Sequence, residues 1–152
     1  MKGECLIRFA VRDDAAGIAS LSGQLGYPTD AAEVGARIEL LETRQERQAV
    51  LVAVDSAGSA IGYAQIGTVD YVYHEAFAEL MGLVVDVAHR GEGVGRRLME
   101  AAESWAAERG LGVLSLRSNV VRADAHAFYE RLGYERVKTQ YSYRKALKGR
   151  RV

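Results

Sequence analysis

The stretch that decides the fold reads His89-Arg90-Gly91-Glu92-Gly93-Val94-Gly95-Arg96-Arg97-Leu98. An apolar run at residues 80–85 (LMGLVV) precedes it and predicts a strand. After it, apolar side chains recur at helical spacing, at Val94, Leu98, Ala101 and Trp105. The stretch therefore leads the chain from a strand into the N-terminus of a helix.

A turn of this kind favours an anion, and a phosphate in particular. The first amides of a helix have no intrahelical acceptor, and the helix dipole places about half a positive charge at that end. Glycine at positions 91, 93 and 95 lets the turn adopt positive φ and lets the backbone approach a ligand closely. Arg90, Arg96 and Arg97 add positive charge. We therefore expect several N–H groups of this turn to point at one anion.

The spacing excludes the two commonest phosphate loops. A dinucleotide fingerprint needs G-x-G-x-x-G, and here the third glycine comes one residue early. A Walker A loop ends in Gly-Lys-Ser/Thr, which this stretch lacks. Two readings remain at this point, namely an R-x-x-G-x-G phosphate loop over Arg90 to Gly95 and a glycine-rich turn that holds no ligand.

Composition predicts an ordinary globular protein without a nucleic-acid, membrane or metal partner. Of the 152 residues 49% are hydrophobic and 26% charged, and 20 basic side chains balance 20 acidic ones, so nothing favours polyanion binding. No apolar stretch is long enough to span a membrane. The three histidines, His74, His89 and His126, lack the spacing of metal ligands. Cys5 is the single cysteine and lies in an apolar run, which predicts a buried, inert thiol in a reducing, cytoplasmic compartment.

The other elements follow from periodicity and from turn residues. Further strands are predicted at residues 4–11, 48–54, 60–69, 112–118, 134–138 and 141–147. Four helices are predicted. The first follows Asp13-Asp14 and ends at Gly26, and the second follows Asp30 and runs to about Arg44. The third runs from Val94 to Gly110, and the fourth is capped by Asp124 and ends at Gly133. The two consecutive N-terminal helices either cover one edge of a substrate cleft or serve core packing alone, since the polar residues of their connection, Gln24, Tyr27 and Thr29, are equally compatible with solvent.

A glycine at position 82, in the middle of a strand, predicts a β-bulge. The order strand, helix, strand across the glycine turn predicts a parallel pair. The fold class is therefore α/β (α+β), with one domain over residues 1–148 and a basic tail at 149–152. We expect a mixed, mostly antiparallel sheet of 6–7 strands, whose central parallel pair splays at the bulge, flanked by about four helices.

This order of elements resembles the fold of the GNAT superfamily of N-acetyltransferases. Residues 83–98, with Arg90-Gly91-Glu92-Gly93-Val94-Gly95, are similar to the central acetyl-CoA motif of that superfamily. Residues 128–134 (FYERLGY) are similar to its later motif. Two motifs in this order are more specific than either alone, and they disfavour a turn without a ligand. The resemblance covers residues 79–138 closely and the N-terminal part only in element order.

The resemblance implies a cofactor site for acetyl-CoA as cosubstrate. Backbone groups of Leu83, Val84 and Val85 would lie beside the pantetheine chain, which runs like an added strand. The pyrophosphate would rest on the loop residues Arg90, Gly91, Glu92, Gly93, Val94, Gly95 and Arg96. Many relatives carry an asparagine seven residues before the motif tyrosine, but position 122 is arginine here. Either Asn119 or Arg122 would take that role.

The resemblance also implies the catalytic residues. Tyr129 occupies the tyrosine position of the later motif and would protonate the departing thiolate. Glu79 lies at the start of the central strand and would act as the base, directly or through water, while His74 and Glu75 are weaker candidates.

The implied function is direct transfer of an acetyl group from acetyl-CoA to a primary amine, most naturally that of a small molecule. A protein or peptide amine is an alternative acceptor, and a non-catalytic acyl-CoA sensor is an alternative function. Tyr141 and Tyr143, on the predicted closing strands, are assigned to the core or to a homodimer interface.

Overall fold

The computed structural model describes residues 4–149 and contains a five-stranded mixed sheet. The strands lie in chain order: β1 Leu6–Phe9, β2 Gln48–Val54, β3 Ala60–Tyr71, β4 His74–Val85 and β5 Leu114–Leu116. Neighbours from β1 to β4 are antiparallel, and β4 and β5 are parallel, as the strand-helix-strand order predicts. The described residues form two compact units, one ending at Arg117 and one beginning at Ser118.

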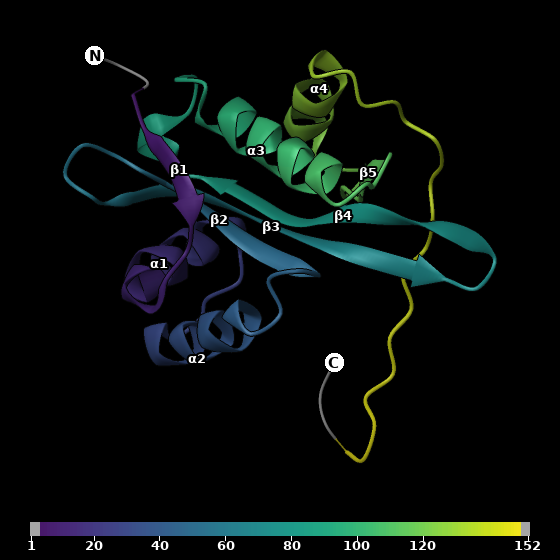
Figure 1. The fold of residues 1–152 in the computed structure, drawn as a ribbon, viewed down its shortest axis with the longest axis horizontal. Helices are drawn as coiled ribbons and strands as arrows, with labels where there is room; N and C mark the ends of the chain where they lie inside the picture. The colour runs from purple at the N-terminus through teal and green to yellow at the C-terminus, as the bar shows by residue number, and fades with distance from the viewer. Residues whose placement is uncertain (1–3, 150–152) are drawn as a thin grey trace. The chain divides into compact units, whose positions relative to one another are not determined.

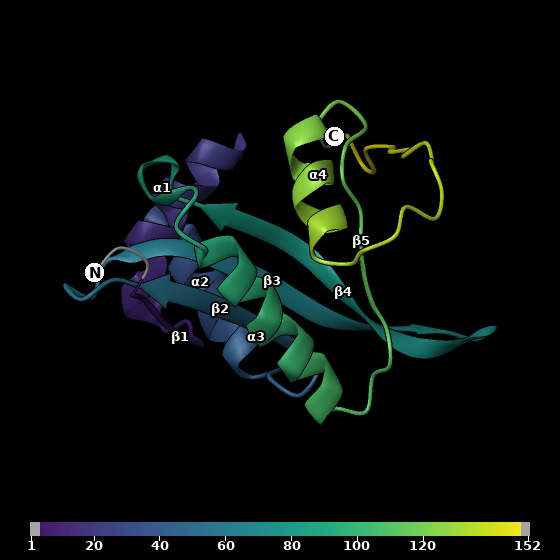
Figure 2. The ribbon, with the colours of Figure 1, turned by 90° about the horizontal axis from the view of Figure 1, so that it is seen from above.

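Helices cover both faces of this sheet within the first unit (Figure 1). Helices α1 (Ala15–Leu25) and α2 (Ala31–Glu42) lie on one face, where the Ser22 hydroxyl is 2.9 Å from the Tyr63 hydroxyl of β3. Helix α3 (Val94–Glu108) crosses the other face (Figure 2). There the backbone of Gly62 packs so closely that a Cβ would lie 3.1 Å from Leu98. The interior holds small and branched apolar residues, the largest fully buried being Ile66, Leu98, Met99, Val52 and Val94.

Helix α1 follows a short 3₁₀ turn, η1 (Arg12–Asp14), which is fixed by a buried carboxylate. Asp14 accepts hydrogen bonds from both terminal nitrogens of Arg8, at 2.8 and 2.9 Å, and from the backbone N–H of Val11 at 2.8 Å. Burial alone would raise the pKa of Asp14, but these hydrogen bonds and the Arg8 charge outweigh it, so the pKa of Asp14 is lowered. The pair ties β1 to the start of α1.

The C-terminus of α3 is anchored by Arg109. Its guanidinium donates to the carbonyl oxygens of Trp105, Glu46 and Gln45, each at 3.1 Å, and lies 4.0 Å from the centre of the Trp105 ring. These contacts attach the segment between α2 and β2 to the last turn of α3.

The second unit contains helix α4 (Ala123–Arg131), whose N-cap is Arg122 and not Asp124. Asp124 lies in the first turn, so its assignment as the cap is wrong. The prediction of 6–7 strands is also too high, because residues 134–147 form no strand in the part of the chain that the structure describes. Tyr141 and Tyr143 are 89% and 88% exposed, so the assignment to the core is wrong, whereas a dimer interface stays a prediction.

The remaining differences concern element ends and the chain termini. Strand β5 covers three residues of the predicted 112–118, and β4 starts at His74, six residues before the predicted strand at 80–85. The predicted basic tail at 149–152 lies outside the described residues except for Gly149. The single domain over 1–148 stays a prediction.

Candidate active site

A β-bulge interrupts strand β4 next to Gly82. Gln65 of β3 is opposite Gly82 and Ile66 is opposite Leu80, so Met81 is the extra residue on β4. The parallel pairing with β5 runs from Ala78 to Leu80 and ends immediately before the bulge. The prediction of a parallel pair that separates at a bulge near Gly82 is thus confirmed.

Beyond the bulge, the edge of β4 that faces away from β3 pairs with no described strand. The N–H of Asp86 donates to the carbonyl of Ile61 at 2.9 Å, which places the backbone groups of Asp86 toward β3. Because N–H and C=O groups alternate sides along a strand, those of Leu83 and Val85 point away from β3. These are the two residues whose backbone is expected to pair with an extended ligand.

The glycine loop begins after a short 3₁₀ turn, η2 (Val87–His89). Asp86 accepts from the N–H of Ala88 at 3.1 Å, and Gln24 of α1 accepts from the N–H of Val87 at 3.0 Å. Gln24 is one of the polar residues whose role the sequence leaves open, and in the structure it holds the turn between β4 and the loop. Gln24 lies 62 residues or more before this turn along the chain, so no local sequence pattern indicates the contact.

Two of the three loop glycines adopt the left-handed conformation that the sequence predicts, whereas Gly95 lies inside α3. Gly91 has φ 80° and Gly93 φ 84°, and no atom lies within 4 Å of the Cβ position of either. Gly93 is the N-cap of α3, and the first intrahelical bond runs from the N–H of Arg97 to its carbonyl. The N–H groups of Val94, Gly95 and Arg96 therefore have no partner within the helix.

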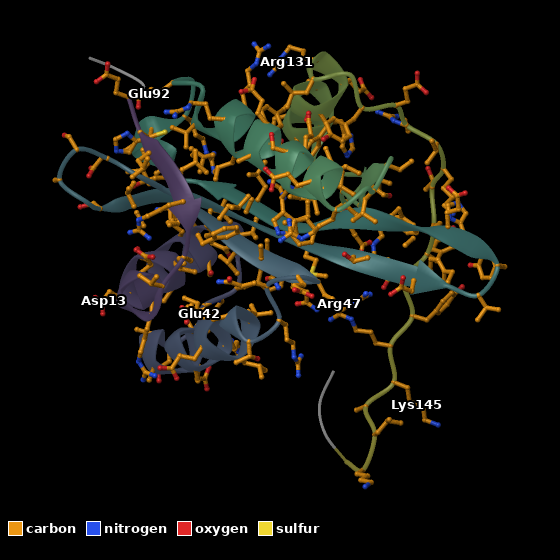
Figure 3. All side chains as sticks on the ribbon, in the orientation of Figure 1. Asp13, Glu42, Arg47, Glu92, Arg131 and Lys145 are labelled. Carbon is orange, nitrogen blue, oxygen red and sulfur yellow. The ribbon has the colours of Figure 1, made fainter. Side chains whose placement is uncertain are left out.

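The charges around the loop differ in part from the prediction. Arg90 is exposed, and Arg96 forms an exposed pair with Glu100 at 3.2 Å. Glu92, labelled in Figure 3, pairs with Nδ1 of His89 at 3.0 Å. The guanidinium of Arg97 donates to the carbonyl oxygen of Cys5 and, at 3.0 Å, to its Sγ. Cys5 is also only partly buried, contrary to the prediction.

Glu79, the predicted base, lies on β4 two residues before the bulge residue. It is opposite Gly67 on β3 and opposite Ser115 on β5. Its carboxylate is 3.2 Å from Nε of Arg117, and the side chains are 20% and 80% exposed respectively. Arg117 is a residue that sequence reasoning missed.

The hairpin of β3 and β4 extends beyond the end of β2 (Figure 1). An aromatic cluster lies at the turn of this hairpin. The rings of Tyr71 and Tyr73 stack with their centres 5.1 Å apart. The centre of the Phe77 ring lies 5.9 Å from that of Tyr71 and 5.6 Å from that of His74. His74 and Glu75, the weaker base candidates, are exposed in this turn, and Nδ1 of His74 lies 2.7 Å from the carbonyl oxygen of Glu75.

The second unit contains Tyr129, the predicted acid, on α4. Its ring makes edge contacts with Phe128 at 5.2 Å and Tyr134 at 6.1 Å. Burial raises the pKa of Tyr129, although the charge of Arg122 acts in the opposite direction. The hydroxyl therefore stays protonated at neutral pH.

Asn119 and Arg122, the two candidates for the missing asparagine, lie at the start of α4. The side-chain oxygen of Asn119 accepts a hydrogen bond from the N–H of Val121 at 3.2 Å, and its backbone carbonyl oxygen accepts one from the N–H of Arg122 at 3.0 Å. Nε2 of His126 lies 2.8 Å from the same carbonyl. Asn119 thus shapes the turn before α4, and the exposed side chain of Arg122 extends from its N-cap.

Residues 13–134 match the acetyltransferase (GNAT) family. This chain belongs to that family. The match covers the free edge of β4, the glycine loop and Tyr129, and it confirms both the resemblance inferred from the two motifs and the prediction that the protein is an acetyltransferase.

Relatives of this acetyltransferase differ in the acceptors for which they are named. The aminoglycoside N(6')-acetyltransferase type 1 of Stenotrophomonas maltophilia is 31% identical and covers 93% of both chains. The L-methionine sulfoximine/L-methionine sulfone acetyltransferase of Pseudomonas aeruginosa is 30% identical, and the match covers 83% of this chain and 80% of the relative's chain. A solved aminoglycoside N-acetyltransferase in complex with CoA has a TM-score of 0.82 at 22% identity, covering 95% and 96% of the chains, and supports the fold.

Two features are absent from residues 4–149. No helix in this range has the length and apolar character needed to cross a membrane. No group of three or more His, Cys, Asp or Glu side chains in the same range is arranged to hold a metal ion.

Proposed function

We propose that this acetyltransferase transfers an acetyl group from acetyl-CoA to the primary amine of a small molecule, by direct attack of the amine. One observation carries the proposal: the edge of β4 that pairs with no described strand is followed, after the short turn η2, by two left-handed glycines and the free amides of α3. An extended chain that ends in phosphates matches this order of hydrogen-bonding groups.

The residues present fit the CoA portion of the cosubstrate. The backbone groups of Leu83 and Val85 would pair with the pantetheine amides, since they point away from β3. The amides from Gly91 to Arg96 would receive the pyrophosphate, because side chains are lacking at both left-handed glycines and α3 offers its positive end. Arg90 would add a cation at the rim.

Bound acetyl-CoA would supply the thioester, whose carbonyl carbon bonds to the amine nitrogen while the C–S bond breaks and CoA departs as the thiol. Glu79 would accept, directly or through a water, the proton that the acceptor ammonium must lose before its nitrogen can attack. Tyr129 would give a proton to the departing sulfur, and the raised pKa of Tyr129 keeps this proton in place at neutral pH.

The first test is the thermal unfolding midpoint with increasing acetyl-CoA, with NAD and ATP as controls. A ligand at about 100 times its dissociation constant adds about 2.7 kcal/mol, which raises the midpoint by several degrees in a domain of this size. A rise with acetyl-CoA alone supports the cosubstrate. No rise in folded protein contradicts it.

The second test measures thiol release with a panel of primary amines for Tyr129→Phe. We expect kcat to fall about 100-fold or more, with a small change in KM, because the hydroxyl acts on the leaving group. Tyr143→Phe is the matched control, since Tyr143 belongs to the same unit and is 88% exposed. Wild-type turnover by Tyr129→Phe would remove Tyr129 from the mechanism.

A further inference from the structure

We propose that the acceptor carries an acidic group close to its primary amine, as in an α-amino acid or an aminoalkylphosphonate, and that Arg117 binds this acid. The inference rests on the proposed function. It specifies the acceptor class of the same site and assigns a role to a residue outside both sequence motifs.

Glu79 and Arg117 reach the same face of the sheet from two parallel strands. Glu79 is in register with Ser115, and Arg117 follows two residues later, so both side chains point to one side. Glu79 is also opposite Gly67, which shares its face with Tyr63, the partner of Ser22 on α1. The pair therefore lies on the face that α1 and α2 cover in part.

The pair leaves most of the Arg117 guanidinium available. Its Nε lies 3.2 Å from the Glu79 carboxylate, and the side chain is 80% exposed, so most of its N–H donors reach solvent. A guanidinium has five N–H donors in a planar fork that fits a carboxylate or phosphonate with two parallel bonds. A permanent cation beside the proposed base attracts such an acid, whereas it repels a second ammonium group.

The surroundings of the pair fit a short acceptor. Asp70, the carboxylate nearest the turn on β3, already pairs with Arg47, so it does not offer a free negative charge to a polycation. Met81 and Phe77 flank Glu79 along β4, and the methyl of Met81 lies over the backbone of Gly67. They provide an apolar surface for the rest of a short acceptor, since Met81 is 45% exposed.

The experiment compares acceptors that differ only in the acid. The pairs are methionine with 3-(methylthio)propylamine and phenylalanine with 2-phenylethylamine, and spermidine represents polycations. CoA thiol release gives kcat and KM for each. We expect the amino acid of each pair to have a kcat/KM about 10-fold or more above that of its amine, because a hydrogen-bonded ion pair typically gives a factor of this size.

Arg117→Gln then tests the assigned residue. We expect KM for the amino acids to rise about 10- to 100-fold, and the preference for each amino acid over its matched amine to fall about 10-fold or more. Arg117→Lys should recover part of the loss, since it keeps the charge but not the fork. Arg136→Gln is the matched control, because Arg136 is another exposed arginine paired with a glutamate, Glu130.

The outcomes separate the two proposals. Equal or faster turnover of the matched amines or of spermidine overturns the inference and leaves the acetyltransferase proposal in place. An equal loss for both members of each pair in Arg117→Gln also overturns it, because Arg117 would then act only through Glu79. Absence of thiol release with every amine, together with no thermal shift by acetyl-CoA, overturns the proposed function itself.

Discussion

Gly93→Ala tests whether the glycine loop is held in the left-handed conformation at the start of α3. Gly93 has φ 84° and is the N-cap of the helix, and no atom lies within 4 Å of its Cβ position. A methyl group there meets no neighbour, so the cost comes from the backbone alone. For a residue with a Cβ, the left-handed conformation costs about 1–2 kcal/mol.

Gly23→Ala is the matched control because it makes the same chemical change with the opposite expected sign. Gly23 lies inside α1, and again no atom lies within 4 Å of its Cβ position. Alanine is favoured over glycine in a helix by about 0.5–1 kcal/mol, so this variant should be more stable than the wild type.

Urea unfolding, followed by circular dichroism, gives both free energies. We expect Gly93→Ala to lose about 1–2 kcal/mol, or about 2–8 °C in midpoint temperature for a chain of this length. If acetyl-CoA binds as proposed, its affinity for Gly93→Ala also falls, because the loop amides turn. Unchanged stability of Gly93→Ala beside a stabilised Gly23→Ala would show that the loop does not need positive φ, and would refute the reasoning.

Three other substitutions test the fold by equilibrium unfolding. Asp14→Asn should cost about 1–3 kcal/mol at pH 7. The pKa of Asp14 in the folded protein lies below its ordinary 3.8. The difference in free energy of unfolding between the wild type and Asp14→Asn is therefore fully present above about pH 4 and decreases as the pH falls further. Arg109→Gln should cost about 1–3 kcal/mol, as three carbonyls lose their donor. Gly62→Ala should cost about 1–3 kcal/mol, because its Cβ would lie 2.9 Å from the carbonyl oxygen of Val84, which cannot move freely.

The sequence was sufficient for features that depend on neighbouring residues. Glycines 91 and 93 have the predicted positive φ, because a left-handed turn into a helix leaves glycine as the residue without a steric cost. Gly82 marks the bulge to within one residue, and Gly26 ends α1 with φ 100°. Each of these predictions needs only local backbone sterics.

Features that depend on distant partners were missed. The tyrosine-rich residues 134–147 have strand-like patterns, but alternation forms a strand only where a neighbouring edge accepts the hydrogen bonds, and Val137, Tyr141 and Tyr143 remain exposed. Arg117 meets Glu79 only because β5 pairs in parallel with β4 in one particular register. Nothing in the sequence around either residue fixes that register.

The bulge at Met81 indicates how one strand would serve two substrates under the proposed function. Before it, the side chains of Phe77 and Glu79 point to the face that bears α1, where the acceptor amine would approach. After it, the side chains of Leu83 and Val85 point to the face that bears α3, although these positions are also odd-numbered, because Met81 adds one residue to the strand. Their backbone groups point out of the edge that pairs with no described strand, where the cosubstrate would lie. The acceptor would thus use a face and the cosubstrate an edge of the same strand, on opposite sides of the bulge. Both substrates could then be bound together, which direct attack requires.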